Sequence, residues 1–349
     1  MKKNNRLLFL LIIILVIWNV ILTVLLSNAN IEVTNKTDIN QTTVTGFSTD
    51  LTKVFAENKS SVVVVESGSS LSSGIIYKSI DDVVYVLTTY HGIADSNYIR
   101  VVFASGASHE ASLVDKDIFS DIAVLEVKAD FEVVPVKLGN SDLLNDGEFL
   151  ACIGTPTNIQ YANSNELAIV SNKLRTINNS ITFDDNNYEY YIDAIQLSSD
   201  LKEGYSGSPI FNMAGEVQGL ITMKDDTAVF ALPINEVKII ADNIINGKEY
   251  NKIQFGFKGV IVNELETYEK NQLNVSLDIN NGFLINSIKS NSFANSLGLK
   301  TSDVIISIND KTINKYADLL EIEYTDTRTF ELKVERNGEE IILTGSIND

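Results

Sequence analysis

The chain has 349 residues, of which 44% are hydrophobic and 21% are charged, so its composition is globular and its length allows two or three domains. Its formal net charge of −19 argues against binding to a nucleic-acid backbone, which needs clustered Lys and Arg side chains. The sequence holds a single cysteine, Cys152, and two histidines. It therefore predicts no intrachain disulfide, no metal cluster and no cofactor.

Residues 7–26 carry no charged side chain, and about 20 apolar residues are enough to cross a bilayer. Three basic residues precede this segment and none follows it directly, which predicts a cytoplasmic tail at residues 1–6 and an extracytoplasmic remainder. We therefore expect a single-pass protein of the cell membrane. The competing interpretation is a cleaved signal peptide with its cleavage site at Ser27-Asn28-Ala29.

The segment that follows, residues 27–47, is rich in Asn, Thr and Ser and predicts a linker. Ser48-Thr49-Asp50 offers an N-cap for a helix over residues 51–57. Short β-rich runs separated by turns then predict an all-β barrel architecture. These runs cover residues 62–66, 74–77, 83–88, 99–103, 122–127 and 216–223. Apolar spacing predicts a closing helix over residues 235–245.

The stretch Glu203-Gly204-Tyr205-Ser206-Gly207-Ser208-Pro209-Ile210 places a serine between two glycines. Glycine accepts a positive φ and lets a substrate backbone approach closely, so this loop suits a nucleophile. The backbone N–H groups of Gly204 and Ser206, which flank Tyr205, could converge on a developing oxyanion. An ordinary surface turn has the same composition, so the octet needs support from elsewhere in the chain.

That support comes from His91, which follows a β-rich run, and from Asp121, which opens an apolar one. A hydroxyl nucleophile needs a base, and the base needs an acceptor that holds its tautomer. The order His91, Asp121, Ser206 is that of the chymotrypsin-like arrangement. The other histidine, His109, lies in a stretch that predicts an exposed turn. Taken singly, His91 and Asp121 could be ordinary strand-end residues.

Residues 60–240 resemble the trypsin-like protease domain of the HtrA/DegP family. The matching segments are Thr88-Thr89-Tyr90-His91-Gly92, residues 121–127, Ile153-Gly154-Thr155-Pro156, residues 195–200, residues 204–220 and Phe230-Ala231-Leu232-Pro233. Four positions depart from the family pattern: Thr89, Ala168, Tyr205 and Ser208. Ala168 lies in the stretch that matches the family's activation-loop region, and Tyr205 lies beside the oxyanion loop, where it would alter substrate access.

The resemblance implies a protease domain over residues 48–250, built as a chymotrypsin-like double β-barrel of six strands each. His91 and Asp121 would come from the first barrel, and Ser206 from the second. Gly204, Tyr205 and Ser206 would form the oxyanion hole. The resemblance also implies a homotrimer to which residues 46–55 contribute.

Residues 254–347 resemble the small α+β PDZ domain that follows HtrA proteases. The matching segments are Phe257-Lys258-Gly259-Val260, residues 282–285, residues 292–305 and a hairpin over residues 330–343 that turns at Asn337-Gly338. By this resemblance, Phe257, Lys258, Gly259 and Val260 form the loop that captures the carboxylate of a C-terminal peptide. A packing or regulatory module that binds no peptide is the alternative.

Three hypotheses for function follow. The first is a membrane-anchored serine endopeptidase of HtrA type that degrades or processes misfolded exported proteins, bound as extended chains. The second is a catalytically silent protein that captures peptides through the C-terminal domain. The third is a processing protease that cleaves one membrane or surface regulator.

Overall fold

The computed structural model describes residues 47–94, 96, 98–183, 186–224, 228–247, 253–273 and 275–347, together with Leu15, Ile17 and Trp18. The chain divides into two compact units, Met1–Thr43 and Val44–Asp349. Most of the expected transmembrane segment 7–26 lies outside the described residues. Within the part of the chain that the structure does describe, no helix is both long enough and apolar enough to span a bilayer.

Six antiparallel strands close the first barrel in the order β1-β2-β3-β6-β5-β4. Their bounds are β1 Val62–Ser67, β2 Ser70–Ile80, β3 Val83–Thr89, β4 Ile99–Val102, β5 Ser108–Asp117 and β6 Ile122–Lys128. Side chains alternate between two apolar faces, as the period of a strand requires. Val63 and Val65 fill the barrel, while Val62 belongs to a second cluster outside it. The expected β-rich runs of this region are all strands.

Six further strands close the second barrel in the order β10-β11-β12-β9-β8-β7. Their bounds are β7 Phe149–Gly154, β8 Ser164–Phe183, β9 Asn186–Ser198, β10 Pro209–Phe211, β11 Val217–Lys224 and β12 Val229–Pro233. Ala168 is fully buried in β8, where it pairs with Leu150, and its φ is not positive. The stretch that matches the family's activation-loop region is therefore paired strand at Ala168, where no positive φ is needed.

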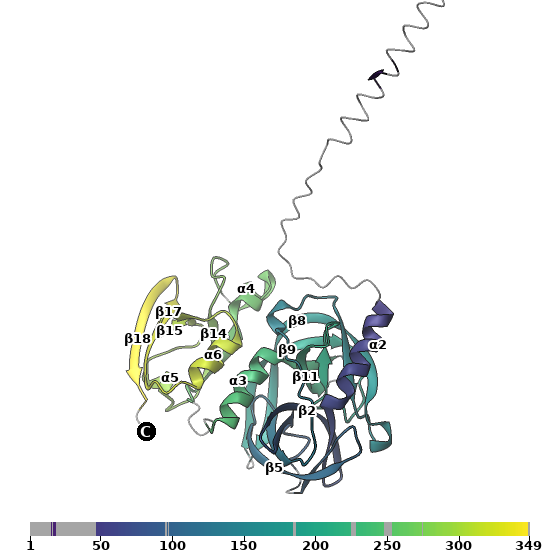
Figure 1. Cartoon of the computed structure of the whole chain (residues 1–349). Helices are drawn as coiled ribbons and strands as arrows, with labels where there is room; N and C mark the ends of the chain where they lie inside the picture. Colours follow the sequence, from purple (N-terminus) through teal and green to yellow (C-terminus); the bar gives the residue numbers. More distant parts are fainter. Residues whose placement is uncertain are drawn as a thin grey trace, which may run out of the picture. The chain divides into compact units, whose positions relative to one another are not determined.

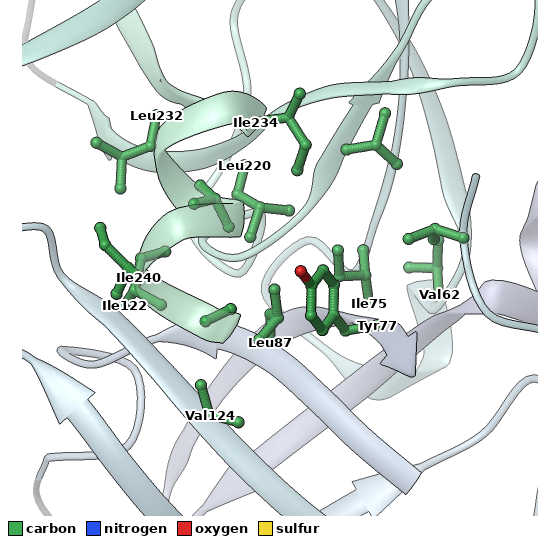
Figure 2. Close-up of a cluster of buried hydrophobic side chains, with 14 of the residues drawn as sticks. Val62, Ile75, Tyr77, Leu87, Ile122, Val124, Leu220, Leu232, Ile234 and Ile240 are labelled. Carbon is green, nitrogen blue, oxygen red and sulfur yellow. The ribbon is translucent and has the colours of Figure 1, made fainter. Parts of the chain in front are cut away.

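The helix that follows the two barrels packs against strands of both (Figure 1). An apolar cluster joins this helix to the barrels and is the largest core among the described residues of the protease region (Figure 2). Val62, Ile75 and Leu87 of the first barrel pack there with Leu220 and Leu232 of the second. Short helical segments complete the region: α2 Phe47–Asn58, α3 Ile234–Ile245, and the 3₁₀ turns η1 Lys59–Ser61, η2 Ser141–Leu143 and η3 Ile159–Tyr161. The helix α3 lies where the sequence predicts it, whereas α2 begins four residues before its expected body and contains the expected cap residues.

The C-terminal region forms a mixed domain around one sheet, with the strand order β13-β14-β15-β17-β18 and β16 paired to β15. The bounds are β13 Phe257–Ile261, η5 Val262–Glu264, α4 Thr267–Gln272, β14 Phe283–Ile288, α5 Phe293–Ser296, β15 Val304–Ile308, β16 Lys311–Thr312, α6 Tyr316–Glu323, β17 Thr329–Arg336 and β18 Glu339–Ser346. The predicted hairpin is confirmed, since β17 pairs with β18. Its turn residues Asn337 and Gly338 both have a positive φ, as a tight hairpin turn requires.

The expected carboxylate loop is a strand instead. Phe257, Lys258, Gly259 and Val260 lie in β13 and pair with β14, with a register irregularity between Lys258 and Gly259. A Cβ at position 259 would lie 1.8 Å from the carbonyl oxygen of Leu284, so only glycine lets the backbone pack so closely here. This close approach draws the segment into the sheet. In the recorded strand order, β13 stands at one end of the sheet.

Candidate active site

The histidine and the aspartate lie at the ends of two neighbouring strands. β3 and β6 pair from Val83 to Thr89, and His91 and Asp121 lie just beyond the last pair, Thr89 and Ile122. The N–H of Tyr90 donates to the carbonyl of Asp121 at 2.8 Å, which continues the contact past the strands. Asp121 has a φ of 59°, a left-handed conformation that aspartate tolerates better than most residues. Strand pairing therefore brings base and carboxylate together.

Asp121 binds His91 through both carboxylate oxygens. Its Oδ1 accepts the backbone N–H of His91 at 2.8 Å, and its Oδ2 lies 2.6 Å from the ring Nδ1. A third donor is the hydroxyl of Thr222, 2.8 Å from Oδ2. The carboxylate is 13% exposed, so these donors replace most of its water. Sequence reasoning missed Thr222, which lies in β11 of the other barrel and has no local motif that would have identified it.

Ser206 completes the triad from the second barrel. Its Oγ lies 3.0 Å from Nε2 of His91, so the three side chains form a continuous hydrogen-bonded chain. The flanking glycines have φ values of 92° at Gly204 and 80° at Gly207. A Cβ on Gly207 would lie 2.0 Å from the carbonyl oxygen of Ser73 in the first barrel. Glycine is thus required on both sides of the serine by conformation and by close packing.

The pKa of His91 lies above its ordinary value of 6.5. Burial is the largest single influence and lowers this pKa, because it disfavours the charged ring. The hydrogen bond and the negative charge of Asp121 together outweigh burial and raise the pKa. A base held in this way accepts a proton more readily than a free imidazole, which suits general-base chemistry near neutral pH.

Two N–H groups of the serine loop point to an oxyanion site. In the part of the chain that the structure describes, the N–H groups of Gly204 and Ser206 have no recorded acceptor. The N–H of Tyr205 lies between them and donates to the carbonyl of Lys202 at 3.4 Å. Of the three residues predicted to form the oxyanion hole, Gly204 and Ser206 thus offer free donors and Tyr205 does not.

The side chain of Tyr205 lies inside the second barrel and is only 2% exposed. Burial raises the pKa of its hydroxyl, with a further contribution from the nearby Cys152 and Glu166. A Cβ on Gly154 would lie 2.4 Å from the Tyr205 ring, so this glycine makes room for it. The expectation that Tyr205 alters substrate access was wrong, because its ring points into the core.

The second histidine also differs from its expected position. His109 lies in β5, not in an exposed turn, and its ring packs 6.0 Å from that of Phe103 and 5.5 Å from that of Phe131. Cys152 is a fully buried thiol, and burial raises its pKa. No cluster of three metal-binding side chains occurs among the described residues.

Comparison with known proteins agrees with this geometry. A family profile described as a trypsin-like peptidase domain matches residues 72–220. A "Serine protease HtrA-like" protein of Staphylococcus epidermidis is 29% identical over 354 residues, covering 93% of this chain and 60% of the relative. "Serine protease Do-like HtrA" of Bacillus subtilis is 32% identical, with 79% and 62% covered. The chain therefore spans about 60% of the length of these curated relatives.

Solved structures share the fold at lower sequence identity. The HtrA-type protease AlgW with a bound tripeptide has a TM-score of 0.61 and 22% identity, covering 85% of this chain and 96% of its own. A serine endoprotease from Yersinia pestis has a TM-score of 0.55 and 20% identity, covering 85% and 96%.

Two closed six-stranded barrels that together contribute a hydrogen-bonded Ser-His-Asp set are the fold and the catalytic arrangement of trypsin-like serine proteases. The comparisons add that residues 72–220 match a trypsin-like peptidase domain and that the chain is similar to serine proteases of HtrA type.

Proposed function

We propose that this protein is a membrane-anchored, extracytoplasmic endopeptidase that cuts unfolded or damaged exported proteins. The observation that carries the proposal is the aligned triad: Nε2 of His91 lies 3.0 Å from Oγ of Ser206, and Nδ1 lies 2.6 Å from Oδ2 of Asp121. In this arrangement Nε2 of His91 is already within the distance at which it can take the proton of Ser206.

The chemistry follows from these distances. Oγ of Ser206 attacks the carbonyl carbon of the scissile peptide bond while Nε2 of His91 takes the hydroxyl proton. The carbonyl electron pair moves to oxygen, where the N–H groups of Gly204 and Ser206 stabilise the negative charge. The tetrahedral intermediate then expels the amine, which receives its proton from His91. Water repeats the sequence on the acyl-enzyme and regenerates the serine.

Asp121 stays a carboxylate, neither gaining nor losing a proton, throughout this cycle. Its Oδ2 accepts a hydrogen bond from Nδ1–H, which leaves Nε2 as the lone-pair nitrogen that faces Ser206. When Nε2 is protonated, the carboxylate stabilises the imidazolium. The hydroxyl of Thr222 fixes the same oxygen from the second barrel, so the carboxylate is held from both sides of the site.

Polypeptide substrates fit this chemistry, and the solved AlgW structures with a tripeptide and a decapeptide support the same substrate class for this chain. The C-terminal domain would bind peptide C-termini by adding a strand to its sheet, because β13 ends the recorded strand order and offers an edge for such an addition. Residues 7–26 would anchor the chain in the membrane, and residues 46–55 would contribute to a homotrimer.

The test is labelling of the full chain, purified in detergent, with a fluorophosphonate probe that reacts with activated serines, with and without unfolded casein. Wild-type protein should be labelled and should cut casein, whereas Ser206→Ala should do neither. Capture of casein without labelling or cleavage would contradict the proposal and favour the peptide-binding alternative. Labelling together with an inability to cut casein would favour a processing protease with one dedicated substrate.

A further inference from the structure

The loop that carries the nucleophile has all of its central carbonyl groups engaged. The carbonyl of Glu203 accepts the N–H of Thr157 at 2.8 Å, and that of Gly204 accepts the hydroxyl of Ser73 at 2.9 Å. The carbonyls of Tyr205 and Ser206 accept the N–H groups of Ser208 and Ser73, each at 2.8 Å. Three of these four bonds come from only two residues outside the loop, Ser73 and Thr157.

These bonds set the direction of the oxyanion donors. In a trans peptide the N–H points opposite to the C=O of the preceding residue, and the structure contains no cis peptide among its described residues. With the Glu203 carbonyl turned toward Thr157, the N–H of Gly204 points away from Thr157. If that peptide unit rotated by half a turn, the carbonyl oxygen would take the place of the donor. The bond from Thr157 therefore keeps the oxyanion site formed.

Ser73 joins three segments through one buried hydroxyl. Its Oγ donates to the carbonyl of Gly204 and accepts the N–H of Thr155 at 3.0 Å, so both hydrogen-bonding capacities of the hydroxyl are used. The residue is fully buried in β2 of the first barrel. A Cβ on Gly204 would lie 2.1 Å from the Thr155 carbonyl oxygen, which shows how tightly the loop lies against this segment.

Thr157 is held in a strained conformation. It has a φ of 50°, and a β-branched residue in the left-handed region is a true outlier. Its side chain is exposed and it has no recorded hydrogen bond through its hydroxyl among the described residues. Such strain persists only where the surroundings enforce it, and it clusters at functional sites. Among the described residues, the one backbone hydrogen bond that Thr157 makes is the bond from its N–H to the carbonyl of Glu203.

We propose that Ser73 and Thr157 are positioning residues that hold the nucleophile loop in its oxyanion-binding conformation, one from each barrel. Neither touches the reacting atoms; each acts on a carbonyl of the loop. The inference rests on the proposed endopeptidase function, because an oxyanion site matters only if Ser206 attacks a carbonyl. It predicts that loss of either contact slows the covalent step without weakening initial binding.

The test measures fluorophosphonate labelling of the full chain as two constants, KI for initial binding and kinact for the covalent step. Ser73→Ala should lower kinact about 10- to 100-fold, a part of the loss seen when an oxyanion donor is removed outright. KI should stay within about two-fold, because the N–H groups act on the developing charge. Ser72→Ala is the matched control, since Ser72 is equally buried on the same strand but has no recorded bond to the loop.

A second pair of variants tests the contact from Thr157. Because Thr157 is exposed, a substitution there should disturb folding less than one at the buried Ser73. Thr157→Pro removes the N–H that binds Glu203, and its ring also forbids the φ of 50°, so this segment must move away from the loop and kinact should fall by a similar factor. Thr157→Gly keeps the N–H and accepts the positive φ without strain, so kinact should stay within about two-fold of wild type. Melting temperatures of all four variants show whether each is folded.

The outcomes separate the two proposals. If wild-type protein is not labelled at all, the endopeptidase function fails. If wild-type protein is labelled and Ser73→Ala reacts as fast as Ser72→Ala, the positioning role is overturned while the protease function stands. Equal kinact values for Thr157→Pro and Thr157→Gly would overturn the role of the Thr157 N–H, whatever Ser73→Ala shows.

Discussion

In the first barrel, the catalytic groups lie within two residues of paired strands: His91 follows β3 and Asp121 precedes β6. In the second barrel, Ser206 lies on an irregular loop between Ser198 and Pro209. Strand pairing fixes the base and the carboxylate through many small interactions, whereas the serine loop depends on a few contacts from Ser73 and Thr157. The nucleophile is therefore the part of the site that single substitutions should displace most easily, and the His-Asp pair the part that resists them.

The largest expected effect comes from removing the nucleophile. Ser206→Ala should lower the turnover of casein by about 10⁶-fold, because the triad acts as a unit and only binding and oxyanion stabilisation remain. The measurement is kcat with fluorogenic casein. Residual turnover within 100-fold of wild type would mean that a group other than Ser206 performs the chemistry. The comparison of the serine loop with the His-Asp pair would then not describe the active site.

Replacing the carboxylate tests the rigid half of the site. Asp121→Asn should lower kcat by about 10⁴-fold, since the amide favours the wrong tautomer of His91. It should also change the pH profile. Because Asp121 raises the pKa of His91, wild-type kcat/KM should fall with decreasing pH at a value above 6.5.

Without the carboxylate, the pKa of His91 drops and the acid limb should move to lower pH. The control is Asp115→Asn, a neighbouring carboxylate in β5 with no recorded contact to His91. An acid limb that stays in place in Asp121→Asn would show that His91 is not the group that titrates.

Thr222→Val tests whether the second barrel helps to hold the carboxylate. The variant keeps the shape of the side chain but removes the hydroxyl that lies 2.8 Å from Oδ2 of Asp121. A hydrogen bond to a charged group contributes about 1.5–3 kcal/mol, so kcat/KM should fall about 10- to 100-fold. The His91–Asp121 pair stays intact, so a loss as large as that of Asp121→Asn would contradict this account. The measurement is kcat/KM on casein for Thr222→Val, Asp121→Asn and the wild type.

The smallest effect on catalysis is expected from the C-terminal domain. Asp303 is 1% exposed and receives two bonds from Arg336, each of 2.7 Å. Arg336→Met leaves this carboxylate buried without its cation and should destabilise the domain by about 3 kcal/mol. Labelling of Ser206 should not change, because the pair is remote from the triad in the chain and in its contacts.

The matched control is Lys333→Met on the same strand, which removes an exposed pair with Glu340 and should cost less than about 1 kcal/mol. Chemical denaturation followed by circular dichroism compares the two variants. Equal destabilisation would show that burial of Asp303 has no special consequence.

The sequence by itself determined most of the local structure. Short β-rich runs predict five of the six strands of the first barrel, all but β5, and Asn337-Gly338 predicts the hairpin turn, because both signals arise from neighbouring residues. The triad residues were also recognisable, since a nucleophile, a base and a carboxylate need particular side chains in a particular order. The structure brings these three side chains together.

Only the tertiary structure decided what surrounds those residues. Thr222 contacts Asp121 across 101 positions, and Ser73 contacts Gly204 across 131. The direction of Tyr205 depends on the space left by Gly154, and the strand at Phe257 depends on the close approach of Gly259 to β14. A common threonine or serine has no distinctive neighbours in the chain, so its role exists only once the two barrels pack together.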